Sequence, residues 1–200
     1  RLVRTISPPD KSYEEDPARM LRAIRAAARL GFAVEAETHE AILRHRETIL
    51  RCPRARILEE LLILFKYGSS ERSLRLLWQY GLMEYLMPVH HAYLLRRECQ
   101  PLEPPKQDVL FDLFAMLDME QTHVEPPIFF ALLVLPILIE SQGADKHFLW
   151  LNRKPSILFS AAETVLDELT KSMDISKRHR ARVVEILATQ AKLILRQSHI

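Results

Sequence analysis

The sequence of 200 residues is 48% hydrophobic and 27% charged and carries a formal net charge of +2, which excludes a mainly disordered chain. Its four glycines, against twelve prolines, leave few positions for the tight turns that an all-β fold requires. We therefore expect an all-α fold whose helices pack in an irregular or solenoid-like array.

The clearest predicted helix follows residues 1–15, which the prolines at 8 and 9 mark as an extended or looped segment. Asp16 is a favourable N-cap, Pro17 suits the first helical position and Gly31 suits the helix end. One face of this helix is apolar and the opposite face is basic: Met20, Leu21, Ile24, Ala27 and Ala28 against Arg19, Arg22, Arg25 and Arg29.

Further helices are expected along the rest of the chain. Their predicted ranges are 36–50, 55–67, 70–81, 107–119, 128–141, 156–172 and 176–196. Gly68 is expected to stop the third helix, and Ser69 or Ser70 to cap the fourth. The three prolines within residues 99–106 predict a linker, and Asp108, Asp112 and Asp118 are interpreted as a solvated helix face.

Charge is distributed unevenly along the chain. Residues 1–56 hold 12 basic and 8 acidic side chains, residues 57–170 hold 9 and 16, and residues 171–200 hold 7 and 2. Basic ends around an acidic middle indicate a polyanionic partner.

The sequence favours a protein that is not in a membrane. The longest apolar run, 128–139, is too short to cross a bilayer and contains Pro136. The two cysteines, Cys52 and Cys99, suit a reducing, intracellular compartment. Because the first residue is Arg1, we expect a processed chain or a fragment, so a targeting segment upstream would be invisible and the organelle stays open.

Asp16 and Arg19 are the strongest candidates for ligand recognition. A carboxylate accepts hydrogen bonds and a guanidinium donates several in a fixed fork, so together they match a base edge with an amino donor beside a ring-nitrogen acceptor. Cytosine and adenine both have such an edge. The simpler alternative is that Asp16 only caps the helix and Arg19 is solvated.

Residues 6–32 resemble the template-independent RNA nucleotidyltransferases, namely the bacterial-type poly(A) polymerases and the class II CCA-adding tRNA nucleotidyltransferases. The segment Glu-Asp-Pro-Ala-Arg-Met-Leu-Arg-Ala at 15–23 carries the resemblance. It implies that Asp16 and Arg19 recognise the base of ATP or CTP, that Glu15 holds Arg19 in place, and that Arg22 belongs to the same nucleotide site.

A second matching element lies at residues 55–61. Its Arg56 and Glu60 are four residues apart on a predicted helix and can form an ion pair. In the family this element shapes the nucleotide pocket from behind. The resemblance extends over about residues 1–95 and implies a neck over 1–98, the linker 99–106, and a helical body over 107–200.

The chain departs from the family at two places before this helix. Ile-Ser-Pro-Pro at 6–9 replaces the usual Ile-Gly-Asp-Pro, and Ser12-Tyr13 replaces an Arg-Phe pair. The family's reaction, attack of an RNA 3′-hydroxyl on a nucleotide α-phosphate, also requires Mg²⁺-binding carboxylates on an upstream β-sheet head. No such Asp-x-Asp pair occurs here, so we assign no catalytic or metal-binding residue and expect the head to be absent.

Basic residues outside the nucleotide site are candidates for contact with RNA phosphates, although ordinary solubility explains them equally well. They are Arg25, Arg29, Lys177, Arg178 and Arg180. The leading hypothesis is the neck and body of a poly(A) polymerase that uses ATP, Mg²⁺ and an mRNA-like or tRNA 3′ end. The alternatives are a CCA-adding enzyme portion, a stand-alone RNA-binding module, and a helical scaffold without nucleotide function.

Overall fold

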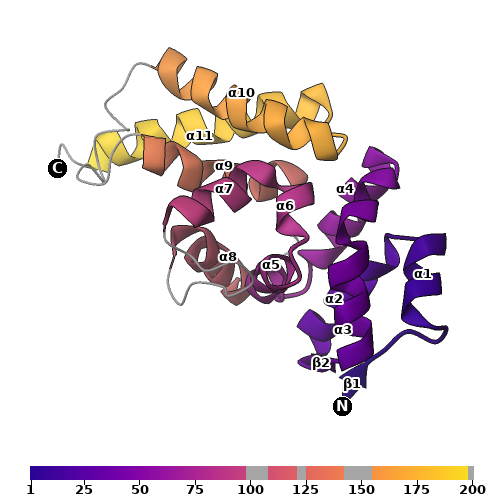
Figure 1. Ribbon diagram of the computed structural model, residues 1–200. Coiled ribbons are helices and arrows are strands. Elements are labelled where there is room, and N and C mark those ends of the chain that lie inside the picture. Colours follow the sequence, from indigo (N-terminus) through magenta and orange to yellow (C-terminus); the bar gives the residue numbers. More distant parts are fainter. Residues whose placement is uncertain (98–107, 121–124, 142–154, 198–200) are drawn as a thin grey trace. The chain divides into compact units, whose positions relative to one another are not determined.

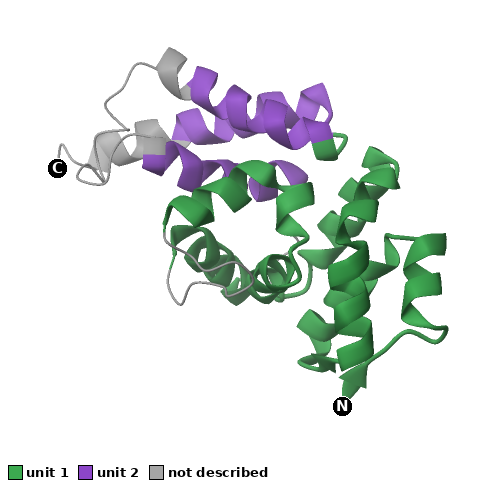
Figure 2. Ribbon diagram, viewed as in Figure 1, with its two compact units in different colours: residues 1–123, 172–174 green, residues 124–171, 175–200 purple. Residues whose placement is uncertain are grey.

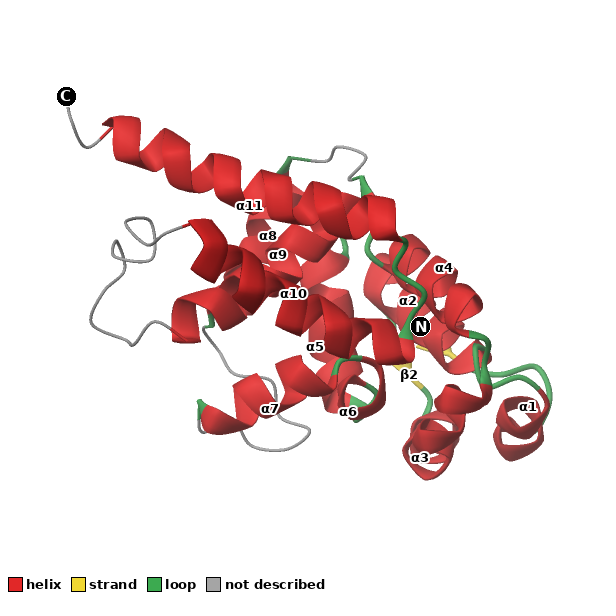
Figure 3. Ribbon diagram, turned by 90° about the horizontal axis from the view of Figure 1, so that it is seen from above, coloured by secondary structure: helices red, strands yellow, loops and turns green. Residues whose placement is uncertain are grey.

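The computed structural model describes residues 1–97, 108–120, 125–141 and 155–197. Helices dominate these ranges, as Figure 3 shows, and the all-α prediction is confirmed. The helices are α1 (Pro9–Glu15), α2 (Arg19–Leu30), α3 (Ala36–His45), the 3₁₀ helix η1 (Arg46–Arg51), α4 (Arg54–Leu64), α5 (Ser70–Gln79), α6 (Met83–Leu86), α7 (Pro88–Arg96), α8 (Val109–Met119), α9 (Pro126–Ser141), α10 (Pro155–Ser172) and α11 (Lys177–Gln197) (Figure 1). Two short strands, β1 (Leu2–Val3) and β2 (Ala33–Val34), pair in parallel.

The chain forms two compact units, coloured separately in Figure 2. The first comprises residues 1–123 and 172–174, and the second comprises residues 124–171 and 175–200. Helix α8 packs on α5 and so belongs to the first unit. The predicted linker 99–106 lies outside the described residues, and the division into neck and body stays a prediction.

Helix α2 has the buried face and the end that its sequence predicts, but it starts two residues later than the predicted first position, Pro17. Its apolar face is buried, with Met20 and Ile24 fully inaccessible, and it packs against α4 and α5. Gly31 ends the helix with a φ of 68°, a left-handed conformation that costs glycine little. The helix begins at Arg19, because the residues after Asp16 form a turn in which the Arg19 N–H donates to the Asp16 carbonyl.

The prediction of a looped segment over residues 1–15 is wrong for α1. Pro9 occupies a first-turn position of this helix, where its missing N–H costs nothing. Helix α1 packs on α3 and buries Ser12 and Tyr13. The buried ring of Tyr13 stands where the resembled family has phenylalanine, so burial of an aromatic side chain stabilises a helix that the paired prolines obscured.

We expect Tyr13→Phe to leave the free energy of unfolding unchanged or to raise it by up to about 1 kcal/mol. The Tyr13 hydroxyl is buried and has no hydrogen-bond partner among the described residues, and this burial, with a smaller contribution from Tyr80, raises its pKa to about 12. Tyr93→Phe is the control, since the Tyr93 hydroxyl donates to Asp108 at 3.1 Å and its loss should destabilise. Denaturant titration measures both, and a clear loss of stability in Tyr13→Phe would contradict the prediction.

Of the three acidic residues interpreted as a solvated face around α8, Asp112 is exposed as predicted, whereas Asp108 and Asp118 bind other parts of the chain. The Asp108 side chain is 2% exposed; it caps α8 by accepting from the Leu110 N–H and pairs with Arg97 at 2.6 Å. The Asp118 carboxylate accepts from the N–H groups of Ser70 and Glu71, both at 2.9 Å. Asp118 therefore supplies the cap that was predicted for Ser69 or Ser70, because a carboxylate suits the positive end of α5.

Candidate functional site

Asp16 lies at the junction of α1 and α2 and joins three arginines. Its Oδ1 accepts from the Ala18 N–H at 3.2 Å, and its Oδ2 accepts from Nη2 of Arg56 at 2.7 Å. The same Oδ2 lies 3.9 Å from Nε of Arg19 and 3.8 Å from Nη1 of Arg22. Only 16% of the Asp16 side chain is exposed, so this carboxylate is fixed by its neighbours.

All the hydrogen bonds that the Arg19 side chain forms with the described residues come from one of its three nitrogens. Its Nη1 donates to the carbonyl and the hydroxyl of Ser12, at 3.3 and 3.2 Å, and to Oε2 of Glu15 at 3.2 Å. The contact expected between Glu15 and Arg19 is therefore present. Among the described residues Nη2 of Arg19 has no hydrogen-bond partner, so this donor is available to a ligand.

Glu60 is a buried carboxylate that binds two arginines of α2. It accepts from Nε of Arg22 at 2.8 Å and from Nη1 of Arg25 at 2.9 Å, with 11% of its side chain exposed. The hydrogen bond to Glu60 raises the pKa of Arg22 above the already high value of an ordinary arginine. The sequence predicted an ion pair between Arg56 and Glu60 within α4, but the structure does not form it. Arg56 instead binds Asp16, and Glu60 binds Arg22.

A cavity of about 530 Å³ lies beside this network. Three arginines and three hydroxyl side chains contribute to its wall, and no acidic side chain does. Its lining residues are Val3, Arg4, Thr5, Ile6, Ser7, Ser12, Arg19, Arg22, Ala23 and Ala26. A cavity of this size, with cations on its wall, can hold an anionic ligand such as a nucleotide.

Sequence reasoning did not identify Arg4 or Thr5 as part of this wall. They follow β1, and the pairing of Leu2 with Ala33 places that strand beside the end of α2. A two-residue strand has no detectable alternating pattern, so the positive charge of Arg4 was the only signal in the sequence that could have identified this part of the wall. Ser12 was recognised only as a departure from the family, whereas its hydroxyl here accepts from Arg19.

The remaining candidate residues give no metal centre in the described part of the chain. No group of His, Cys, Asp and Glu residues in the described ranges is arranged to hold a metal ion. His91 packs on Trp78 with ring centroids 5.1 Å apart, and burial lowers its pKa. Cys52 is buried, and Cys99 lies outside the described residues. No helix within the described ranges has the length and apolarity that crossing a bilayer demands.

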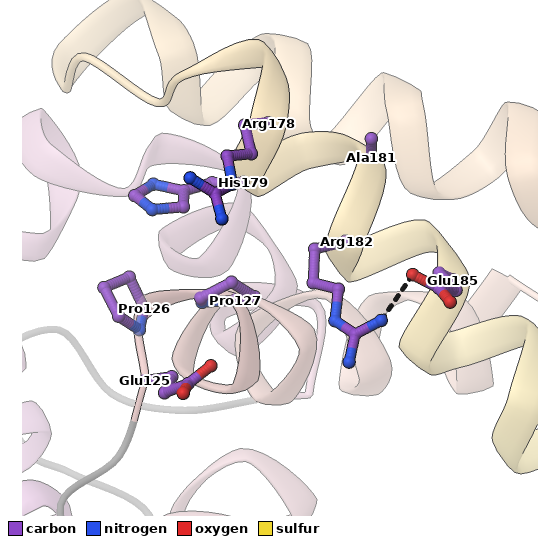
Figure 4. A pocket seen from close by; sticks show the side chains of 8 residues that line it. All are labelled: Glu125, Pro126, Pro127, Arg178, His179, Ala181, Arg182 and Glu185. Carbon is purple, nitrogen blue, oxygen red and sulfur yellow. Dashed lines mark hydrogen bonds and ion pairs between the residues drawn. The ribbon is translucent and has the colours of Figure 1, made fainter.

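The basic residues of α11 have different surroundings, all within the second unit. Arg180 binds Glu163 and, at 2.6 Å, Asp167, so its charge is neutralised on α10. Arg178 lines a second cavity of about 530 Å³ (Figure 4). Lys177 is exposed at the start of the helix. A role for these three residues in RNA binding stays a prediction, and Arg180 is the least available of them.

The second cavity contains acidic as well as basic side chains. Figure 4 shows Arg178, His179 and Arg182 on α11 facing Glu125 and the prolines that begin α9, and Arg182 pairs with Glu185 at 2.6 Å. Its charges therefore largely balance, in contrast to the cavity beside Arg19.

The site residues lie partly within a region that matches a known family. The model of the family described as "Probable RNA and SrmB- binding site of polymerase A" matches residues 31–94. Poly(A) polymerase I of Escherichia coli O6:H1 is 31% identical over 196 residues, which are 98% of this chain and 42% of the relative. Poly(A) polymerase I of Haemophilus influenzae is 30% identical over 97% of this chain and 42% of its own length.

A second group of relatives matches a shorter part. The CCA-adding enzyme of Bacillus velezensis is 35% identical over 86 residues, which are 43% of this chain and 22% of that enzyme. The chain thus spans less than half the length of the relatives that it matches.

Proposed function

We propose that this chain, which belongs to the family of the bacterial poly(A) polymerases and CCA-adding enzymes, selects the nucleotide and binds the RNA in an enzyme that extends RNA 3′ ends. The observation that carries the proposal is the fixed pair of Asp16 and Arg19 beside a cavity with a cationic wall. An intracellular location, where such RNA ends are processed, is part of the proposal.

The geometry suits recognition of a base edge. Ser12 and Glu15 hold one nitrogen of Arg19, which leaves Nη2 as a donor for a ring nitrogen. Arg56 and the Ala18 N–H hold Asp16, which is 16% exposed and lies beside the cavity without lining it, and its remaining lone pairs would accept from an exocyclic amino group. Because donor and acceptor are both fixed before the ligand arrives, adenine or cytosine is favoured over guanine and uracil, which lack that arrangement.

The cationic wall of the cavity suits the phosphates. Arg22, held by Glu60, and Arg4 supply charge that complements a triphosphate. ATP is the proposed substrate of the intact enzyme, and Mg²⁺ its metal ion, which would neutralise the charge that develops on the transferred phosphoryl group. The described residues do not fit a metal ion, so we assign Mg²⁺ to no residue of this chain and derive no step through it.

Poly(A) addition is favoured over CCA addition as the reaction of the intact enzyme. The poly(A) polymerase relatives match 97–98% of the chain, whereas the CCA-adding enzyme matches 43%. An extension assay on a short RNA, with ATP and CTP supplied separately to an enzyme that contains this chain, separates the two. Long runs of A support the proposal, and a limited addition that requires CTP supports the alternative.

Arg19→Ala is expected to lower the affinity for ATP about tenfold and to abolish the preference for ATP over GTP and UTP, because it removes a charged hydrogen bond to the base. Equilibrium titration of each nucleotide into the 200-residue chain measures this. Thermal unfolding should change little, since 39% of the Arg19 side chain is exposed. Arg51→Ala, at an exposed position in η1, is the matched control. Equal discrimination before and after Arg19→Ala would refute this assignment.

A further inference from the structure

Tyr67, between α4 and α5, combines an unfavourable backbone with an exposed ring. Its φ is 67°, a left-handed conformation that no other described non-glycine residue adopts. The residue is 71% exposed, so burial does not offset the strain of this backbone. Strain at a bulky side chain that packs into no core is typical of a position that serves binding.

The turn that carries Tyr67 is fixed on both sides by hydrogen bonds. The Ser70 hydroxyl donates to the Phe65 carbonyl at 2.9 Å, and the Ser69 hydroxyl donates to the Lys66 carbonyl at 3.3 Å. The Asp118 carboxylate holds the N–H groups that follow the turn. The ring therefore projects from an ordered turn, and a ligand that binds it would not first have to order the backbone.

One basic side chain lies over the ring, and a second lies near the same end of α2. The guanidinium carbon of Arg29, in the last turn of α2, lies 4.5 Å from the centroid of the Tyr67 ring. A Cβ added to Gly31 would lie 3.4 Å from Nη1 of Arg72, which places a second guanidinium at the same end of α2. Among the described residues Arg29, Lys66 and Arg72 form no ion pair, so their charges are available to a polyanion.

We propose that Tyr67 and Arg29 form a stacking site for a base of single-stranded RNA, with Lys66 and Arg72 positioned for the adjoining phosphates. An aromatic ring beside unpaired cations is the combination that single-stranded nucleic acids select, because every base has a face that stacks and every linkage carries a charge. Tyr67 also lies within residues 31–94, which match the RNA-binding family model. The inference rests on the proposed function, in that it names a residue pair through which this chain binds RNA.

The decisive variant is Tyr67→Gly, because it removes the ring and also relieves the backbone strain. We expect its affinity for a 12-nucleotide oligo(A), measured by fluorescence anisotropy on the 200-residue chain, to fall about tenfold. The midpoint of thermal unfolding should stay the same or rise. A structural role for the ring would instead lower stability. Tyr67→Phe and Tyr67→Trp, which keep a ring, should retain the affinity.

An abasic oligonucleotide of the same length distinguishes stacking from charge. Tyr67→Gly should bind it as the unmodified chain does, whereas Arg72→Ala should weaken the binding of both oligonucleotides and reduce the salt dependence of each. Unchanged oligo(A) affinity in Tyr67→Gly, while the unmodified chain binds oligo(A), would overturn the stacking site and leave the proposed function intact. Failure of the unmodified chain to bind oligo(A) would overturn both.

Discussion

Glu60→Ala is expected to lower the free energy of unfolding by about 2 kcal/mol and to weaken ATP binding about tenfold. The substitution leaves Arg22 and Arg25 facing each other without the carboxylate that both bind, at 2.8 and 2.9 Å. The loss is smaller than for a fully buried pair, because 42% of Arg22 and 25% of Arg25 are exposed and water can solvate them. Arg22 then leaves its position on the cavity wall.

Two further variants separate charge from shape at this position. Glu60→Gln keeps the volume and one acceptor, so it should lose less stability than Glu60→Ala yet still bind ATP more weakly than the unmodified chain. Glu59→Ala, at the exposed neighbouring position of α4, should change neither property. Denaturant titration and ATP titration on the same preparations give both quantities. Full ATP affinity in Glu60→Ala would show that Arg22 does not need Glu60 to serve the site.

The helices near the proposed nucleotide site were largely predictable because their sequence signals are local. The spacing of Met20, Leu21 and Ile24 fixes which face of α2 is buried, and Gly31 fixes where the helix ends. Arg19 and Arg22 follow on the opposite face from the same periodicity. The contact between Glu15 and Arg19 was expected from a resemblance, and the structure places those atoms 3.2 Å apart.

The partners of the remaining charges were not predictable, because they come from other helices. Arg56 and Glu60 satisfy the spacing of an ion pair within one helix, yet a pair of that kind contributes only a few tenths of a kcal/mol. Partly buried partners in other segments form stronger pairs and replace it: Arg56 binds Asp16, and Glu60 binds Arg22. Sequence spacing carries no information on such contacts between residues about 40 positions apart.

The same limitation explains Asp108 and Asp118, for which a helical pattern alone suggested the exposure that only Asp112 shows. Asp118 caps a helix that begins 48 residues earlier in the chain, and Asp108 is buried against α7. When a buried carboxylate finds its partners in a distant segment, the sequence around it does not distinguish it from a solvated one. The turn that carries Tyr67, the proposed stacking site, is therefore held by a residue that no local pattern connects with it.

Asp108→Ala is expected to destabilise the chain more than Glu60→Ala does, with a loss of about 3 kcal/mol in the free energy of unfolding. It removes the N-cap of α8, a loss of about 1 kcal/mol. It also leaves the buried Tyr93 hydroxyl without this acceptor, which costs about 1–2 kcal/mol more. The loss of Arg97 as partner adds less, because 46% of the Arg97 side chain is exposed.

Asp108→Asn tests how this loss is divided, since asparagine also caps helices and still accepts from Tyr93. It should lose only the charge interaction with Arg97 and so retain most of the stability. Asp112→Ala, in the first turn of α8, is the matched control and should change stability by less than about 0.5 kcal/mol. Because α8 also carries Asp118, loosening α8 should weaken oligo(A) binding at the Tyr67 turn more than ATP binding at Arg19. Equal weakening of both ligands in Asp108→Ala would indicate general unfolding of the first unit and would contradict this local coupling.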